Sequence, residues 1–83
     1  MKKKIAILGS TGSIGQSTLE VIKKDNKNFD IILLSANNNY KKLIQQAKQF
    51  KAKNVLIKNK IFYERVKKAL KKKRRKFFQV IPL

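Results

Sequence analysis

Residues 7–18 read ILGSTGSIGQST, and this stretch places three glycines, at positions 9, 12 and 15, between an apolar run and a helical pattern. The apolar run, Ile5–Leu8, is short and unbroken, which is typical of a strand buried on both faces. The residues that follow form one stripe at helical spacing: Ile14, Thr18, Val21 and Ile22. The stretch therefore predicts a strand, a glycine-rich turn and a helix, in that order.

Both ends of this first helix are marked in the sequence. Ser13 and Gln16 have the spacing of a capping box, in which two side chains satisfy backbone N–H groups at the helix start. The helix is expected to end within residues 23–26, where Lys23 and Lys24 suit the negative end of the helix dipole.

The same alternation continues along the chain. Apolar runs at residues 29–34 and 55–57 predict two further strands. Two further helical stripes are present, one at Tyr40, Leu43, Ile44, Ala47 and Phe50 and one at Phe62, Val66, Ala69 and Leu70. The order strand, helix, strand, helix, strand, helix predicts an α/β fold: a half-Rossmann βαβαβα unit with a three- or four-stranded parallel sheet and right-handed crossovers.

The predicted unit takes up residues 1–70 of the 83-residue chain, which is one small domain at most. Residues 71–83 are predicted to be a basic tail, in which residues 77–81 are a possible fourth strand. Eight of the ten residues 67–76 are basic. Such runs often mark contacts with nucleic acid, and the alternative is a solvated helix end with no partner.

Composition limits the chemistry that this chain can perform. It has 22 basic residues and four acidic ones, giving a formal net charge of +18 that attracts polyanions such as nucleic acid, membrane surfaces or phosphorylated cofactors. The absence of Cys and His excludes disulfides, a zinc site with the usual ligands, a thiol nucleophile and an imidazole base. The apolar run before Gly9 is far too short for a signal peptide or a membrane span, so a cytoplasmic location without membrane contact is expected.

The glycine spacing is G-x-x-G-x-x-G, placed where a phosphate-binding loop must lie, after the first strand and at the start of the first helix. Unpaired N–H groups and the helix dipole favour an anion there. Gly9 would permit the tight turn, Gly12 the close approach of a pyrophosphate, and Gly15 close packing of helix on strand. The hydroxyl groups of Thr11 and Ser13 can add donors to phosphate oxygens.

Two other interpretations of the loop exist. It can be a plain strand-to-helix turn, since turns favour glycine and serine anyway. A mononucleotide P-loop does not fit, because Ser10 and Gln16 stand where that motif needs its first glycine and its lysine.

The end of the second predicted strand indicates which dinucleotide would bind. NAD-binding units usually place an acid there for the ribose 2′-hydroxyl. Here the strand leads into Ser35 and then Asn37, Asn38 and Asn39, and no acid occurs between Asp30 and Glu64. Neutral donors followed by lysines favour NADP over NAD, although one asparagine can also cap the next helix.

The segments KKIAILGSTGSIGQSTLEVI, LLSANNN and LIQQAKQFKAKNVLI resemble the N-terminal NADPH-binding region of the 1-deoxy-D-xylulose 5-phosphate reductoisomerase family, from about Lys3 to about Leu70. The resemblance implies a homodimeric enzyme of the non-mevalonate isoprenoid pathway that rearranges a sugar phosphate and reduces the product with NADPH, using Mg²⁺ or Mn²⁺. It also places the cofactor phosphates against residues Thr11, Gly12, Ser13 and Ile14. The adenosine ribose and its 2′-phosphate would lie at Asn37, Asn38 and Asn39, although the family often has glycine and a basic residue at the first two of these positions.

By the same resemblance, the metal-binding carboxylates, substrate-phosphate contacts and lid of the family lie beyond this first region. The chain alone is therefore expected to bind NADPH and to catalyse nothing. The alternatives are a fragment of another NADP-dependent reductase, such as the aspartate-semialdehyde dehydrogenase type, and a small basic nucleic-acid-binding protein.

Overall fold

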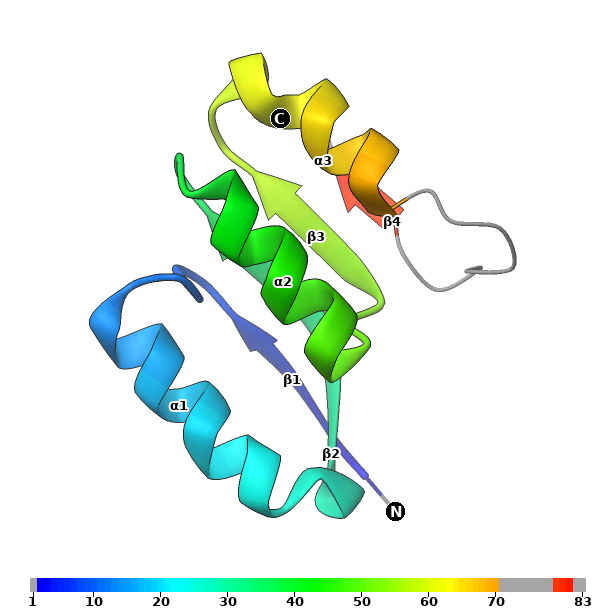
Figure 1. Cartoon of the computed structure of the whole chain (residues 1–83). Helices are drawn as coiled ribbons and strands as arrows, with labels where there is room; N and C mark the ends of the chain where they lie inside the picture. Colours follow the sequence, from blue (N-terminus) through cyan, green and yellow to red (C-terminus); the bar gives the residue numbers. More distant parts are fainter. Residues whose placement is uncertain (1, 71–78, 82–83) are drawn as a thin grey trace.

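The computed structural model describes residues 2–70 and the backbone of residues 79–81. Strands and helices alternate along the chain in the predicted order (Figure 1). The strands are β1 (Lys3–Ile7), β2 (Phe29–Ala36), β3 (Asn54–Ile57) and β4 (Gln79–Ile81). The helices are α1 (Ser13–Lys24), α2 (Tyr40–Phe50) and α3 (Tyr63–Leu70), with short 3₁₀ turns η1 (Asn26–Asn28) and η2 (Lys60–Phe62).

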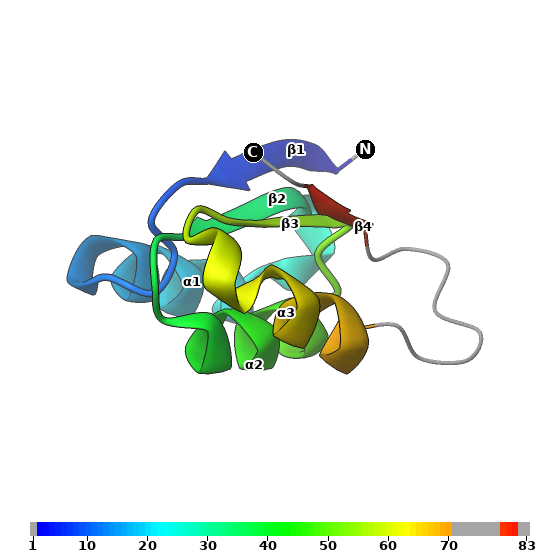
Figure 2. The ribbon, with the colours of Figure 1, turned by 90° about the horizontal axis from the view of Figure 1, so that it is seen from above.

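The four strands form one sheet in the order β1-β2-β3-β4, and every neighbouring pair is parallel. Since each strand lies beside the one before it, right-handed crossovers place all the connecting helices on one face. Figure 2 shows α1, α2 and α3 together on that face. The predicted half-Rossmann α/β fold is confirmed. Of the possible fourth strand, residues 79–81 are β4, and residues 77 and 78 lie outside the described part.

The core lies between the sheet and this helical layer. Its largest buried apolar side chains come from β2, β3, α2 and α3: Leu34, Leu43, Val55, Ile57, Val66 and Leu70. The apolar stripes predicted for α2 and α3 therefore face the sheet, and burial of this surface is the main force that closes the fold.

The prediction that β1 is buried on both faces is wrong. Ile7 is buried, but Ala6 is exposed and Leu8 is 75% exposed. The reason is the sheet order: with all described helices on one face, alternate residues of β1 point away from them.

The apolar stripe predicted for α1 is confirmed at Ile22 and wrong at Ile14, Thr18 and Val21, which are exposed. The buried residues of this helix are Gly15, Leu19 and Ile22, whereas Ile14 is 84% exposed and Val21 is exposed too. Gly15 lies against the turn that follows β1. That contact fixes the rotation of the helix, and the residues at i+4 and i+7 from Gly15 then face the sheet.

The capping box predicted at Ser13 and Gln16 does not form. The N-cap residue of α1 is Gly12, without a side-chain capping bond. The Gln16 Nε2 amide instead donates to the Thr11 carbonyl oxygen at 2.8 Å. The helix ends at Lys24, as predicted.

Candidate functional site

The predicted phosphate-binding loop lies between the end of β1 and the start of α1. A shallow hollow of about 580 Å³ opens in front of it, lined by Gly9, Gly12 and Gly15 together with residues of β1 and the first turn of α1. This is the carboxyl end of a parallel strand, where α/β sheets bind their ligands.

The turn itself depends on Gly9. Its φ is +69°, a left-handed conformation that favours glycine, and its carbonyl oxygen accepts a hydrogen bond from the Gly12 N–H at 3.1 Å. Gly12 is exposed and extended (φ −79°, ψ 177°), so its own backbone conformation does not require glycine. A Cβ at Gly12 would meet only the Gly9 carbonyl oxygen, at 3.5 Å. The open space at Gly12 is what a close-approaching pyrophosphate needs.

The role of Gly15 differs from those of Gly9 and Gly12. A Cβ built there would collide with the Gly9 carbonyl oxygen and lie 2.6 Å from Ser10 Cα. The missing side chain lets α1 pack directly on the backbone of the loop. This agrees with the role predicted for the third glycine, close packing of the helix.

Backbone N–H groups gather at the start of α1, where Ser13, Ile14 and Gly15 line the hollow. Within residues 2–70 and 79–81, the N–H groups of Thr11, Ser13, Ile14 and Gly15 have no hydrogen-bond acceptor. Ser13 and Ile14 are exposed at the first turn. Together with the positive end of the helix dipole, these groups can receive an anion.

Ser35 was predicted to contact the cofactor, and the structure places it against the glycine loop. Its Oγ accepts a hydrogen bond from the Gly9 N–H at 3.1 Å. Its carbonyl oxygen accepts one from the Ser10 N–H at 2.8 Å. Ser35 thus fixes the loop from the end of β2, while its hydroxyl proton is left to donate elsewhere.

Sequence reasoning missed a second anchor of the loop, Gln46 on α2. Its Oε1 accepts from the Ser10 hydroxyl at 2.7 Å, and its Nε2 donates to the Ser10 carbonyl oxygen at 2.9 Å. Both residues are buried, Ser10 completely. The one available signal was a polar residue between Leu43 and Ala47, on the buried face of a helix.

The three asparagines lie just after β2 and are all exposed. Asn39 is the N-cap of α2, and its Oδ1 accepts from the Lys42 N–H at 3.3 Å. Asn59, which sequence reasoning also missed, donates through Nδ2 to Asn38 Oδ1 at 2.8 Å and through its N–H to the Asn37 carbonyl oxygen at 3.0 Å. The asparagine segment is therefore held in place, with the side chain of Asn37 free of any hydrogen bond within the described residues.

The cap predicts a measurable difference between these asparagines. Asn39→Ala is expected to lower the free energy of unfolding by about 1 kcal/mol, because α2 loses its N-cap. Asn37→Ala should leave stability within about 0.5 kcal/mol, as for an exposed residue without a structural contact. Urea unfolding of both variants measures this, and equal stability losses would contradict the assignment of the cap to Asn39.

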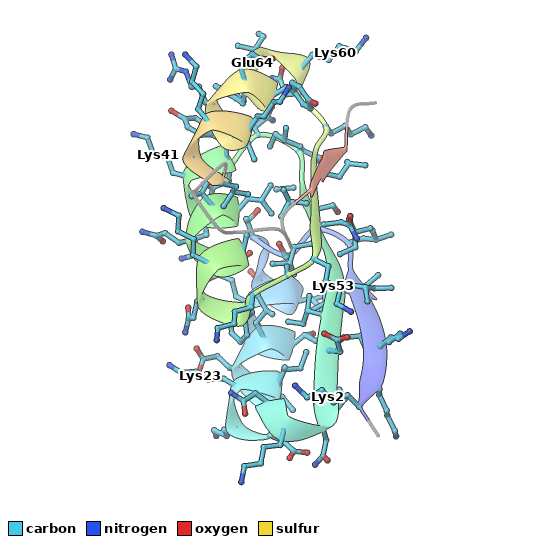
Figure 3. All side chains as sticks on the ribbon, turned by 90° about the vertical axis from the view of Figure 1, so that its right-hand side faces the viewer. Lys2, Lys23, Lys41, Lys53, Lys60 and Glu64 are labelled. Carbon is cyan, nitrogen blue, oxygen red and sulfur yellow. The ribbon has the colours of Figure 1, made fainter. Side chains whose placement is uncertain are left out.

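Positive charge is present beside the asparagines and over the rest of the surface. Figure 3 shows Lys41 and Lys60 at the end where α2 and α3 begin, and Lys2 and Lys23 at the other end. Arg65 of α3 donates to the Tyr40 hydroxyl at 2.9 Å and lies over its ring. The Tyr40 ring in turn stacks on Phe62, with ring centroids 4.5 Å apart. Aromatic and cationic groups thus flank the asparagine segment.

A second hollow, of about 630 Å³, lies at the opposite ends of the strands. Five lysines are among the residues that line it: Lys2, Lys23, Lys27, Lys51 and Lys53. Lys53 is paired with Asp30 at 3.1 Å. The carboxyl ends of α1 and α2 lie on this side, where lysines offset the negative helix dipole. Of the two hollows, only the first lies at the start of an α-helix among the described residues, which makes the glycine loop the better anion site.

Among residues 2–70 and 79–81, no three His, Cys, Asp or Glu side chains lie close enough together to hold a metal ion. In the same residues, no helix is both long and apolar enough to cross a membrane.

A parallel sheet whose first strand leads through a glycine loop into the start of a helix is the architecture of the Rossmann class, whose members typically bind dinucleotides. The sequence model of the family described as 1-deoxy-D-xylulose 5-phosphate reductoisomerase matches residues 5–81. The chain belongs to this family. The match continues past Leu70, where the resemblance was expected to end.

Individual relatives agree with the family assignment. The chain is 66% identical over 55 residues to a 1-deoxy-D-xylulose 5-phosphate reductoisomerase of Pelagibacter ubique, covering 66% of this chain and 14% of the relative. A second such enzyme, of Porphyromonas gingivalis, is 50% identical over 70 residues, covering 84% of this chain and 18% of the relative. The chain therefore spans less than a fifth of the length of these curated relatives.

Solved structures of the family resemble the fold closely. The reductoisomerase of Zymomonas mobilis in complex with NADPH has a TM-score of 0.89 and 33% identity, over 99% of this chain and 21% of that one. A reductoisomerase in complex with NADPH, fosmidomycin and magnesium has a TM-score of 0.86 and 25% identity, over 98% of this chain and 19% of that one.

Proposed function

We propose that this chain is the NADPH-binding part of a 1-deoxy-D-xylulose 5-phosphate reductoisomerase. The main support is a set of backbone N–H groups, at Thr11, Ser13, Ile14 and Gly15, that have no acceptor among the described residues. They belong to a loop that is fixed by hydrogen bonds with β2 and α2 and is open at Gly12. The complex of the Zymomonas mobilis relative with NADPH supports the choice of ligand.

The cofactor would lie across the carboxyl ends of β1 and β2. Its pyrophosphate would accept hydrogen bonds from the free N–H groups and from the hydroxyls of Thr11 and Ser13. Gly9 and Gly15 would shape the loop, and Gly12 would leave room for the phosphate oxygens. The adenosine ribose and 2′-phosphate would lie at Ser35, Asn37, Asn38 and Asn39, where exposed amides and nearby lysines would meet the anion.

When bound, NADPH supplies a hydride for the reduction that follows rearrangement of the sugar phosphate. This chain's own residues bind and orient the nucleotide. The donor set described here does not fit the Mg²⁺ or Mn²⁺ of the family, because no acidic group of three is present among residues 2–70 and 79–81. No step through the metal is derived from these residues.

The experiment is a comparison of NADPH with NADH. We expect NADPH to bind at least about 10-fold more tightly, because one charge-assisted hydrogen bond to the 2′-phosphate is worth about 1.5–3 kcal/mol. Isothermal titration of the purified chain measures both dissociation constants.

Salt is the necessary control, because a chain of net charge +18 attracts any polyanion. The preference for NADPH should persist at moderate salt, whereas loose binding of a single-stranded oligonucleotide should fade. Equal affinities for the two cofactors would contradict the assignment of the 2′-phosphate. Salt-resistant binding of the oligonucleotide with no binding of NADPH would favour the nucleic-acid alternative.

A further inference from the structure

We infer that Gln46 is a positioning residue for the nucleotide: its carboxamide holds the Ser10 peptide so that the next N–H group, that of Thr11, faces the pyrophosphate. This inference rests on the proposed NADPH site and adds a residue from α2, outside the glycine motif, to that site.

The contact between Gln46 and Ser10 requires a side chain with both a donor and an acceptor. The Ser10 carbonyl oxygen can only accept a hydrogen bond, so the Gln46 Nε2 must face it, at 2.9 Å. The Gln46 Oε1 then faces the Ser10 hydroxyl, which donates to it at 2.7 Å. A neutral amide offers a donor group and an acceptor side by side, and it satisfies the carbonyl and the hydroxyl of a residue with no exposed surface.

This contact also sets the direction of a donor. In a trans peptide, the C=O of one residue and the N–H of the next point in opposite directions. With the Ser10 C=O held toward α2 by Gln46, the Thr11 N–H is turned away from α2, and within the described residues it has no acceptor. Gln46 therefore orients one of the groups proposed to bind phosphate without touching the ligand.

A second glutamine acts on the following peptide. The Gln16 Nε2 donates to the Thr11 carbonyl oxygen at 2.8 Å, and Ser35 fixes Gly9 and the Ser10 N–H from β2. The loop is thus held by side chains from three elements. Gln46 contacts Ser10, which has no exposed surface, so the Ser10 carbonyl oxygen cannot bind water instead when Gln46 is removed.

The decisive variant is Gln46→Leu, which keeps the size of the side chain, leaves the Ser10 carbonyl oxygen without its donor, and leaves the Ser10 hydroxyl only the Ser35 carbonyl oxygen, at 3.3 Å. We expect affinity for NADPH to fall about 10- to 100-fold, as for burial of an unsatisfied polar group at the site. Gln45→Leu is the matched control, since Gln45 is exposed on the same helix, and it should bind normally.

Hydrogen exchange without nucleotide separates positioning from folding. In Gln46→Leu, the amides of Gly9, Ser10 and Gly12 should exchange at least about 10-fold faster, while core amides of β2 and β3 stay protected. Loss of protection everywhere would reduce Gln46 to a structural residue and overturn the inference. So would a folded Gln46→Leu chain with unchanged loop exchange and unchanged affinity.

Gln46→Glu provides a rescue. As a carboxylate it accepts from the Ser10 hydroxyl but has no donor for the Ser10 carbonyl, and protonation restores that donor. Affinity for NADP⁺, which is stable in acid, should therefore approach that of the unsubstituted chain as the pH is lowered. No recovery in a chain that remains folded would contradict the inference. If the unsubstituted chain binds no nucleotide, the proposed function fails, and the exchange rates still decide whether Gln46 holds the loop.

Discussion

A Gly12→Val chain is expected to keep its fold and to lose NADPH affinity by about 100-fold or more. The Gly12 position lines the hollow in front of the loop, so a branched side chain would occupy the space proposed for the pyrophosphate. Hydrogen bonds to a charged group are worth about 1.5–3 kcal/mol each, and losing two of them gives a change of this size. Titration with NADPH at moderate salt measures the loss.

The fold should survive because Gly12 adopts an ordinary extended conformation that β-branched residues accept. Its Cβ would be in normal van der Waals contact with the Gly9 carbonyl oxygen, at 3.5 Å. Ser17→Val is the control: Ser17 is exposed on α1, the helix that Gly12 caps, and this variant should fold and bind NADPH normally. A folded Gly12→Val chain with unreduced affinity would mean that the loop is only a turn.

The element order was predictable from the sequence because apolar runs and helical stripes alternate without interruption. The orientation of α1 was not. Ile14 and Val21 are apolar and exposed, whereas the smallest residue of the helix, Gly15, faces inward. The contact of Gly15 with the backbone of Gly9 and Ser10 fixes the rotation of the helix. The hydropathy pattern of the sequence cannot predict such a contact.

The candidate site, too, was predictable from the sequence only in part. The glycine spacing predicted a loop at the right place, because strand, loop and helix are consecutive. The anchors Gln46 and Asn59 lie 36 and 21 residues from their partners, Ser10 and Asn38, so no local spacing could reveal them. Ser35 was predicted to contact the cofactor, and its Oγ accepts a hydrogen bond from Gly9. Its contact with a ribose stays a prediction.

The backbone contact at Gly15 leads to a stability test in which two effects have opposite signs. In Gly15→Ala, helix propensity alone would stabilise the chain by up to about 1 kcal/mol. Overpacking costs about 1–3 kcal/mol, and here the new Cβ would lie 2.6 Å from Ser10 Cα, a backbone atom that cannot rotate away. We therefore expect a net destabilisation of about 1–2 kcal/mol, which for a domain of this size lowers Tm by about 5–15 °C.

Thermal unfolding followed by circular dichroism measures this change, with Ser17→Ala as the control. Ser17 is exposed on α1, so alanine there brings only its helix propensity and should leave Tm unchanged or slightly higher. Opposite signs at positions 15 and 17 would show that close packing of α1 on the loop outweighs helix propensity. A rise in Tm for Gly15→Ala would instead mean that the loop can move away from the helix without cost, and the third glycine would then have no structural role.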